Sequence, residues 1–238
     1  MSKKNMLLIH GWGYHRYNKF KNEDVWEDRD EFINELRKTY NIDIIKLPGF
    51  GGQEEPKEKY WTLDNYADYI NSYIKDNNKS FDYILGYSFG GAVSVSYKIK
   101  YKNKEKLILI SPAINRFYKK NKPFVKTPKI LDKIRKKIRD LYLIYIVKNE
   151  FMKHGTKFLR NTYQIIVRED LTDKIKLINK NEIGFIYGLN DTAVNPKKII
   201  EELPKEYMTR IKTIKDGDHE IAGSHPKEII KLINELYK

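Results

Sequence analysis

The chain has 238 residues, no cysteine and a formal net charge of +14. Without cysteine it cannot use a disulfide scaffold, a Cys-ligated zinc site or a cysteine nucleophile. Its 40% hydrophobic and 13% aromatic residues exclude a disordered polymer, and a chain of this length buries a sizeable core. The longest apolar run covers residues 141–147, which is far short of the roughly 18 residues of a membrane span.

The first apolar stretch stops at His10, which is too short for a secretory signal. We therefore expect a soluble, cytoplasmic protein. The positive charge gathers in residues 113–148, which hold twelve Lys and Arg but only two Asp. Such a patch can bind nucleic acid, anionic lipid or an acidic substrate. However, Lys outnumbers Arg by 37 to 9, a compositional bias that charges any solvated face. In the absence of a nucleic-acid-binding motif we expect no nucleic-acid partner, and only weak contact with anionic surfaces.

Predicted strands alternate with predicted helices along most of the chain. In chain order they are a strand over 6–9, a helix over about 25–40, a strand over 41–47, an amphipathic helix around 66–74, a strand over 83–87, a helix over about 89–101, strands over 106–110, 183–187 and 210–214, and a closing helix after Pro226. This alternation is typical of right-handed crossovers and a parallel sheet.

The alternation breaks after Pro112, where a basic, helix-like stretch without a convincing strand follows. We therefore divide the chain into an α/β core, residues 1–112 and 181–238, and a helical cap insertion, residues 113–180. Ligands bind at the carboxyl ends of parallel strands, so an insertion at a strand end is placed to cover a site.

The strongest motif is Gly86-Tyr87-Ser88-Phe89-Gly90, which follows a predicted strand and opens a predicted helix. A serine between a strand and a helix lies on a very sharp turn, where larger side chains at the two glycine positions would collide. The turn lifts the hydroxyl group into the site and places it at a helix N-terminus. Ser88 is therefore the candidate nucleophile.

A serine hydroxyl needs a base to become a nucleophile. Of the five histidines, His219 follows the last predicted strand and so lies at the same sheet edge as Ser88. We predict that His219 is the general base. His225 is the fallback, although its position before Pro226 favours capping of the final helix. His10 precedes a glycine turn and is expected to support that loop.

The imidazole of the base also needs a carboxylate that fixes its tautomer. Asp191 follows the penultimate strand in Gly188-Leu189-Asn190-Asp191, which places it at the same edge. Asp216 and Asp218 are the alternatives, but they lie close to His219 in sequence and favour turn formation with Gly217.

The tetrahedral intermediate of acyl transfer needs donors for its oxyanion. The loop His10-Gly11-Trp12-Gly13 follows the first strand, and we predict the backbone N–H of Trp12 as one donor. The N–H of Phe89, next to the nucleophile, is the second. The Trp12 ring is also expected to line the substrate pocket.

These motifs together resemble the α/β-hydrolase superfamily, in particular its small, lid-bearing carboxylesterases. The resemblance implies an α/β-hydrolase fold with about six parallel strands, a Ser-His-Asp triad and no metal or organic cofactor. Because only residues 1–5 precede the first predicted strand, we expect the N-terminal antiparallel hairpin that is usual in this superfamily to be absent. The motifs that carry the resemblance are His10-Gly11-Trp12-Gly13, Leu47-Pro48-Gly49-Phe50-Gly51, Gly86-Tyr87-Ser88-Phe89-Gly90-Gly91, Tyr187-Gly188-Leu189-Asn190-Asp191 and His219.

The resulting function hypothesis is a serine hydrolase that cleaves small-molecule esters with small or medium acyl chains. A thioesterase or another triad hydrolase is an alternative, because the fold does not select the bond. A ligand-binding or signalling module with slow turnover is another. Within the cap, Leu143 and Ile146 belong to the longest apolar run, and we predict that they face the acyl pocket.

Overall fold

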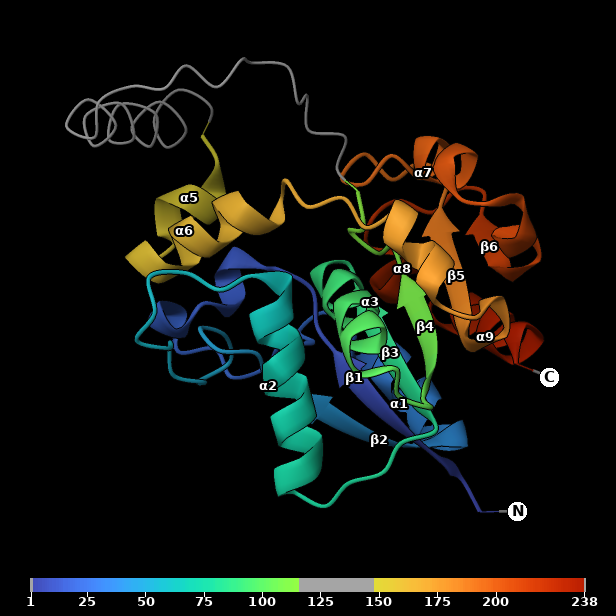
Figure 1. The fold of residues 1–238 in the computed structure, drawn as a ribbon, viewed down its shortest axis with the longest axis horizontal. Coiled ribbons are helices and arrows are strands. Elements are labelled where there is room, and N and C mark those ends of the chain that lie inside the picture. The colour runs from blue at the N-terminus through green and yellow to red at the C-terminus, as the bar shows by residue number, and fades with distance from the viewer. Residues whose placement is uncertain (1, 116–147, 238) are drawn as a thin grey trace.

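A computed structural model describes residues 2–115 and 148–237 of the chain. Its six-stranded sheet has the order β2-β1-β3-β4-β5-β6, and each pair of neighbouring strands is parallel (Figure 1). The strands are β1 (Lys4–Ile9), β2 (Tyr40–Ile45), β3 (Tyr83–Tyr87), β4 (Lys106–Ile110), β5 (Ile183–Gly188) and β6 (Ile211–Ile214). The predicted parallel sheet is confirmed.

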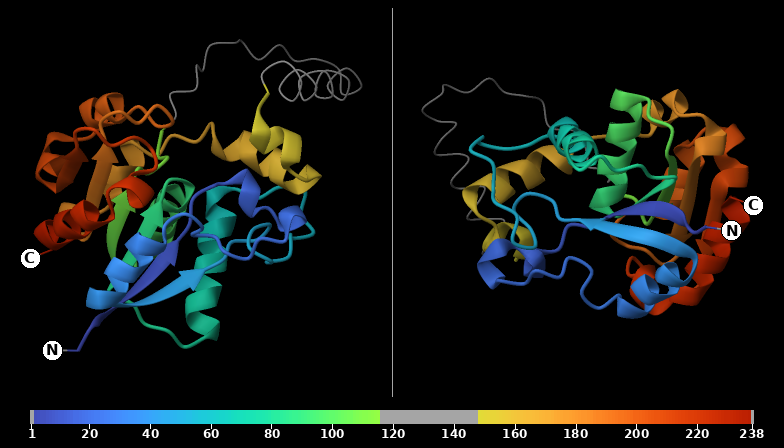
Figure 2. Two further views of the ribbon diagram at one scale, coloured as in Figure 1. Left: turned by 180° about the vertical axis from the view of Figure 1, so that it is seen from behind. Right: turned by 90° about the horizontal axis from the view of Figure 1, so that it is seen from below.

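Helices cover both faces of this sheet. Helices α2 and α3 pack together on one face, whereas α1, α8 and α9 pack together on the other (Figures 1 and 2). The helices are α1 (Asp30–Thr39), α2 (Leu63–Asp76), α3 (Phe89–Tyr101), α5 (Glu150–His154), α6 (Lys157–Ile166), α7 (Pro196–Glu202), α8 (Ile221–Ser224) and α9 (Pro226–Leu236). Short 3₁₀ helices, η1 (Tyr14–Arg16), η2 (Asn18–Phe20), η4 (Asp173–Leu177), η5 (Lys180–Glu182) and η6 (Lys205–Arg210), connect them.

Helix α1 begins later than the sequence predicts. The expected start was near Val25, but the helix begins at Asp30. The Asp24 carboxylate accepts a hydrogen bond from the Trp26 N–H at 2.8 Å, a local turn that competes with helix formation. Asp28 has a φ of 66°, which no right-handed helix allows. Val25 and Trp26 are therefore buried within a turn and do not form the apolar face of a helix.

Strand β2 ends at Ile45 rather than at the predicted Leu47. The backbone N–H of Leu47 donates to the Nε2 atom of His10 at 3.1 Å, so it leaves the strand ladder. This bond ties the loop after β2 to the loop after β1 at the carboxyl edge of the sheet.

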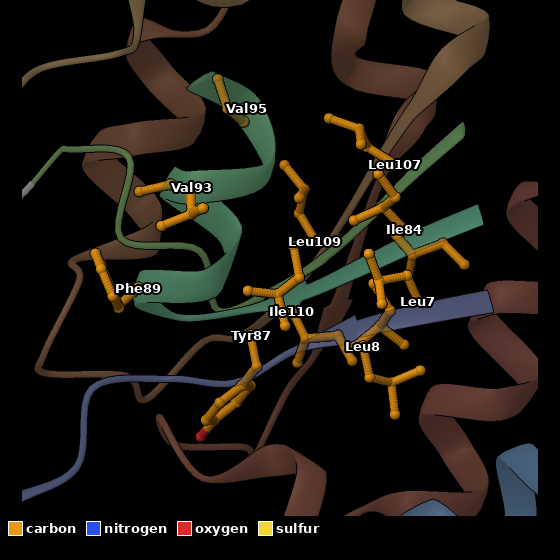
Figure 3. Packing of buried hydrophobic residues seen from close by; sticks show 14 of the residues in the cluster. Leu7, Leu8, Ile84, Tyr87, Phe89, Val93, Val95, Leu107, Leu109 and Ile110 are labelled. Atoms are coloured by element: carbon orange, nitrogen blue, oxygen red, sulfur yellow. The ribbon is translucent and has the colours of Figure 1, made fainter. Parts of the chain in front are cut away.

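The core lies between the sheet and its two helix layers (Figure 3). All five residues of β3 are buried, as expected for a central strand of a parallel sheet that is covered on both faces. Leu7, Ile84, Leu107 and Leu109 are fully buried, and Val93 on α3 packs with them. This rigid centre fixes the positions of the strand ends.

Helix α3 crosses the end of β1 at Gly90. A Cβ atom at this position would collide with the carbonyl oxygen of Ile9 and would lie 2.7 Å from that of His10. Both obstacles are backbone atoms of a buried strand end, which cannot move aside. The absence of a side chain at Gly90 therefore sets the distance between the helix and the sheet.

We predict that Gly90→Ala destabilises the protein by about 3 kcal/mol or more, the upper end of the cost of overpacking. Alanine is the better helix former by about 1 kcal/mol, so a loss of stability would report the backbone collision. Urea titrations measure this loss as the difference in unfolding free energy from the wild type. Gly184→Ala is the matched control, because its new Cβ meets only the flexible Leu236 side chain, at 2.8 Å. Equal stability of the two variants would contradict this explanation.

Candidate active site

The three polar residues that were predicted to work together meet at the carboxyl edge of the sheet. Ser88 follows β3, Asp191 follows β5 and His219 follows β6. The Nε2 atom of His219 lies 2.9 Å from the Ser88 Oγ atom, across 131 residues of sequence. Its Nδ1 atom lies 2.7 Å from the Asp191 Oδ2 atom. The fold thus forms a continuous Ser–His–Asp hydrogen-bonded chain.

The backbone at Ser88 is strained, with a φ of 52° and a ψ of −112°. Neighbouring strands hold it in place, since its N–H donates to the carbonyl of Ile110 at 2.9 Å and its carbonyl accepts from the Ala113 N–H at 2.9 Å. A Cβ at Gly86 would lie 2.5 Å from the Ser94 Oγ atom and 2.6 Å from the Gly90 oxygen. The glycines on both sides of Ser88 are therefore required by the turn, as predicted from the motif.

Asp191 is held as a carboxylate. Its side chain is fully buried, yet its Oδ1 atom accepts hydrogen bonds from the N–H groups of Ala193 at 2.7 Å and Val194 at 3.0 Å. Burial alone would raise the pKa of Asp191, but hydrogen bonding to His219, its charge and these two N–H groups outweigh it and lower the pKa. Both carboxylate oxygens are thus used, one for the turn and one for the imidazole.

Asp216, Asp218 and His225, the alternatives that the sequence offered for the carboxylate and the base, have other partners. The Asp218 carboxylate accepts from the Glu220 N–H at 2.8 Å and forms a turn, whereas Asp216 is exposed and lies 3.5 Å from His225. His225 occupies the N-cap position of α9, although its side chain makes no capping bond; it bonds Ser224 instead, at 2.8 Å.

His10 is fully buried beneath the loop that it was expected to support. Its Nδ1 donates to the Gly11 carbonyl at 2.8 Å, and its Nε2 accepts from the Leu47 N–H. Both bonds together require a neutral ring with the proton on Nδ1. Burial, followed by the nearby Arg16 and Arg29 charges, lowers the pKa of His10 to about 3, so the ring stays neutral.

The loop that carries Trp12 lies directly beside the serine turn. A Cβ at Gly11 would lie 2.9 Å from the Tyr87 ring and 3.3 Å from the Ser88 Cβ. Phe89 is the first residue of α3, so its N–H has no partner within the helix. The Trp12 and Phe89 rings contact each other edge to face at 5.1 Å.

A small apolar cavity of about 20 Å³ opens between these rings and α6. A space of roughly 10–15 Å³ admits one water molecule, so this one is narrow. Three residues at the end of α6 that the sequence analysis missed, Tyr163, Ile166 and Val167, complete its wall. The other lining residues are Trp12, Leu63, Phe89, Ala92 and Ala113.

The contact between α6 and the core depends on polar as well as aromatic groups. The Trp12 and Tyr163 rings lie 5.5 Å apart, and the Trp61 N–H donates to the Thr162 hydroxyl at 3.0 Å. The i, i+3 spacing of Tyr163 and Ile166 was the available sequence signal for this face. Leu143 and Ile146, the predicted pocket residues, lie outside the described residues.

Residues 4–158 match the alpha/beta hydrolase fold family. The chain belongs to this family. The family resemblance that the motifs predicted is therefore confirmed.

Named relatives of this alpha/beta hydrolase include two pimeloyl-[acyl-carrier protein] methyl ester esterases. The protein from Pseudoalteromonas atlantica is 28% identical over 46% of this chain and 38% of its own length. The protein from Aeromonas hydrophila is 21% identical, with 98% of this chain and 94% of that protein aligned. Among solved structures, an esterase from Exiguobacterium antarcticum superimposes with a TM-score of 0.66 at 17% identity, covering 100% of this chain and 93% of that one. That similarity shows the fold.

Within residues 2–115 and 148–237, no helix has the length and apolarity to cross a membrane. In the same ranges, no group of three or more His, Asp or Glu side chains is arranged to hold a metal ion.

The lowered pKa of Asp191 predicts a pH-dependent contribution to stability. An unfolded Asp titrates near 3.9. The folded group titrates lower, so its contribution is complete above about pH 5 and is lost as the pH falls through the folded pKa. We expect the difference in unfolding free energy between wild type and Asp191→Asn to shrink from pH 6 to pH 2 in urea titrations. Asp216→Asn, at an exposed site, should show a difference within about 0.5 kcal/mol throughout. A constant difference for Asp191→Asn would contradict the prediction.

Proposed function

We propose that this alpha/beta hydrolase is a serine esterase that cleaves carboxylic esters of small-molecule substrates with short apolar acyl chains. The observation that carries the proposal is the hydrogen-bonded chain from Ser88 Oγ through His219 to Asp191, with distances of 2.9 and 2.7 Å. A serine, a base and an orienting carboxylate in this order are the parts that acyl transfer requires.

In the proposed reaction the Ser88 Oγ attacks the ester carbonyl carbon while His219 Nε2 takes its proton. Asp191, fixed by two backbone N–H groups, holds the imidazole and stabilises its positive charge. The backbone N–H groups of Trp12 and Phe89 bind the oxyanion.

His219 then returns the proton to the leaving alcohol oxygen, and the C–O bond breaks. A water molecule, deprotonated by His219, cleaves the resulting acyl-enzyme and regenerates the Ser88 hydroxyl. The named relatives, two methyl ester esterases, support ester hydrolysis. A thioester differs only in its leaving atom, so thioesters belong in the same substrate screen.

We expect Ser88→Ala to abolish hydrolysis of p-nitrophenyl acetate, because no nucleophile remains. Ser96→Ala is the matched control: Ser96 lies on α3, the helix that begins directly after Ser88, and it bonds the Asp64 carboxylate at 2.7 Å, away from the site. Turnover by Ser88→Ala at the wild-type rate would overturn the proposal. A wild-type protein that is labelled at Ser88 by a fluorophosphonate but turns over no ester or thioester would favour the binding module instead.

The cavity between Trp12, Phe89 and α6 is proposed as the acyl pocket. Most of its lining side chains are aliphatic or aromatic, and its volume of about 20 Å³ suits an acetyl group better than a longer chain. Helix α6 belongs to residues 113–180, which we propose as the cap that shields the acyl-enzyme from bulk water. The end of α6 thus contributes three residues to the pocket wall, and Tyr163 has the largest side chain of the three.

Tyr163→Ala should widen the pocket and shift the preference toward longer acyl chains. We expect the ratio of kcat/KM for hexanoate to that for acetate to rise about tenfold. Burial of about two further CH₂ groups, at about 0.8 kcal/mol each, gives this factor, because about 1.4 kcal/mol is a factor of ten. The measurement is a series of p-nitrophenyl esters from acetate to octanoate. Gln164→Ala, the adjacent position that does not line the cavity, should keep the wild-type profile. An unchanged profile in Tyr163→Ala would locate the acyl pocket elsewhere.

A further inference from the structure

Tyr87, the residue before Ser88, links β3 to the loop that carries His219. Its side chain lies on the face of the sheet opposite α3 (Figure 3) and is 2% exposed. The hydroxyl lies 2.7 Å from the backbone carbonyl oxygen of His219 and 2.9 Å from the Glu220 Oε2 atom. One hydroxyl thus reaches two consecutive residues of a loop 132 positions away.

Arg29 neutralises the charge of the Glu220 carboxylate. Its guanidinium group forms an ion pair with Glu220 and lies over the Tyr87 ring, 4.8 Å from the ring centre. Burial would raise the pKa of Glu220, but Arg29, the Tyr87 hydroxyl and the nearby His219 outweigh it and lower the pKa. Glu220 is therefore an anion whose counterion is supplied from the segment before α1.

The proton count at Tyr87 shows what this ion pair does. The hydroxyl has one proton to donate, and two of its neighbours, the His219 carbonyl and the Glu220 carboxylate, only accept. Its third neighbour, the Arg29 guanidinium, only donates and bonds the hydroxyl oxygen. Burial raises the pKa of Tyr87, so the proton stays on the phenol. With Arg29 donating to the carboxylate, the proton is available for the shorter bond, the one to the His219 carbonyl.

We propose that Tyr87 is a positioning residue for the base, which holds the backbone of His219 so that its Nε2 atom stays on the Ser88 hydroxyl. This inference rests on the proposed esterase mechanism. Asp191 fixes the imidazole at its Nδ1 atom, and Tyr87 fixes the main chain of the same residue from the other side. Tyr87 directly precedes Ser88 in the chain. Its hydrogen bond to the His219 carbonyl therefore couples the position of the base to that of the nucleophile.

Tyr87→Phe removes only the hydroxyl. We expect kcat to fall on the order of 10–100-fold, the range that follows from a misplacement of up to about 1 Å. KM should change less than about twofold, because Tyr87 is not among the lining residues of the acyl cavity. The rate constant for labelling of Ser88 by a fluorophosphonate should fall by the same factor, since that step also needs the base.

Tyr207→Phe is the matched control for a merely structural role. Tyr207 is equally buried, and its hydroxyl bonds two backbone carbonyls, those of Ile175 at 3.0 Å and Ile178 at 2.5 Å. It should lose stability in urea unfolding and keep its kcat per fluorophosphonate-titrated site. A wild-type kcat in Tyr87→Phe, or an equal loss in Tyr207→Phe, would overturn the inference.

The proton argument adds a rescue experiment. Arg29→Met removes the ion-pair partner of the Glu220 carboxylate, so this carboxylate competes with the His219 carbonyl for the Tyr87 proton, and kcat should fall. Adding Glu220→Gln removes the competing charge. The value of log kcat for the double variant should then lie at least halfway from that of Arg29→Met back to that of the wild type. A double variant that is no faster than Arg29→Met alone would contradict the proton assignment.

A failure of the proposed function is distinguishable from a failure of this inference alone. If Ser88→Ala retains turnover, the esterase mechanism is wrong, and the positioning role that rests on it is overturned with it. If Ser88→Ala is inactive and Tyr87→Phe has the wild-type kcat, the mechanism stands and the positioning role of Tyr87 is excluded.

Discussion

The site depends on one constraint, the change of direction between β3 and α3 at Ser88. Its positive φ of 52° costs of order 1–3 kcal/mol for a non-glycine residue. Bonds to Ile110 and Ala113, together with the close crossing at Gly90, hold it. The turn raises Ser88 above the ends of β1 and β4. His219 and Asp191 therefore need only short loops at the same edge of the sheet to complete the hydrogen-bonded chain with it.

The sequence was sufficient for the parts of the fold that depend on local pattern. The strand–helix alternation predicts all six strands, and the glycines around Ser88 predict the turn because a Cβ at Gly86 or Gly90 meets backbone. Asp191 and His219 followed from their positions after strands. The start of α1 was missed because Asp24 and Asp28 interrupt an apolar pattern that by itself favours a helix.

What the sequence could not predict are contacts between segments far apart in the chain. Tyr163 lines the cavity with Trp12 because α6 packs over the loop after β1, and nothing in the spacing of either segment indicates that pairing. The bond from Tyr87 to His219 is of the same kind. The sequence pattern of a buried strand predicts that its tyrosine is a core residue. Only the structure shows that the loop between β6 and α8 passes the Tyr87 hydroxyl and accepts its hydrogen bond.

The charges buried around the base fit this view of the site. Arg16 is 3% exposed, and its Nε atom has no hydrogen-bond partner among the described residues. Burial, and then the neighbouring Arg29, lower the pKa of Arg16 to about 10. A hydrophobic side chain of similar volume would avoid this desolvation cost. The charges of Arg29 and Arg16 help to lower the pKa of Glu220. In the proposed arrangement, the paired Glu220 leaves the Tyr87 proton to the His219 carbonyl. In this proposal, burial of the two guanidinium groups costs part of the folding free energy and fixes the geometry around His219.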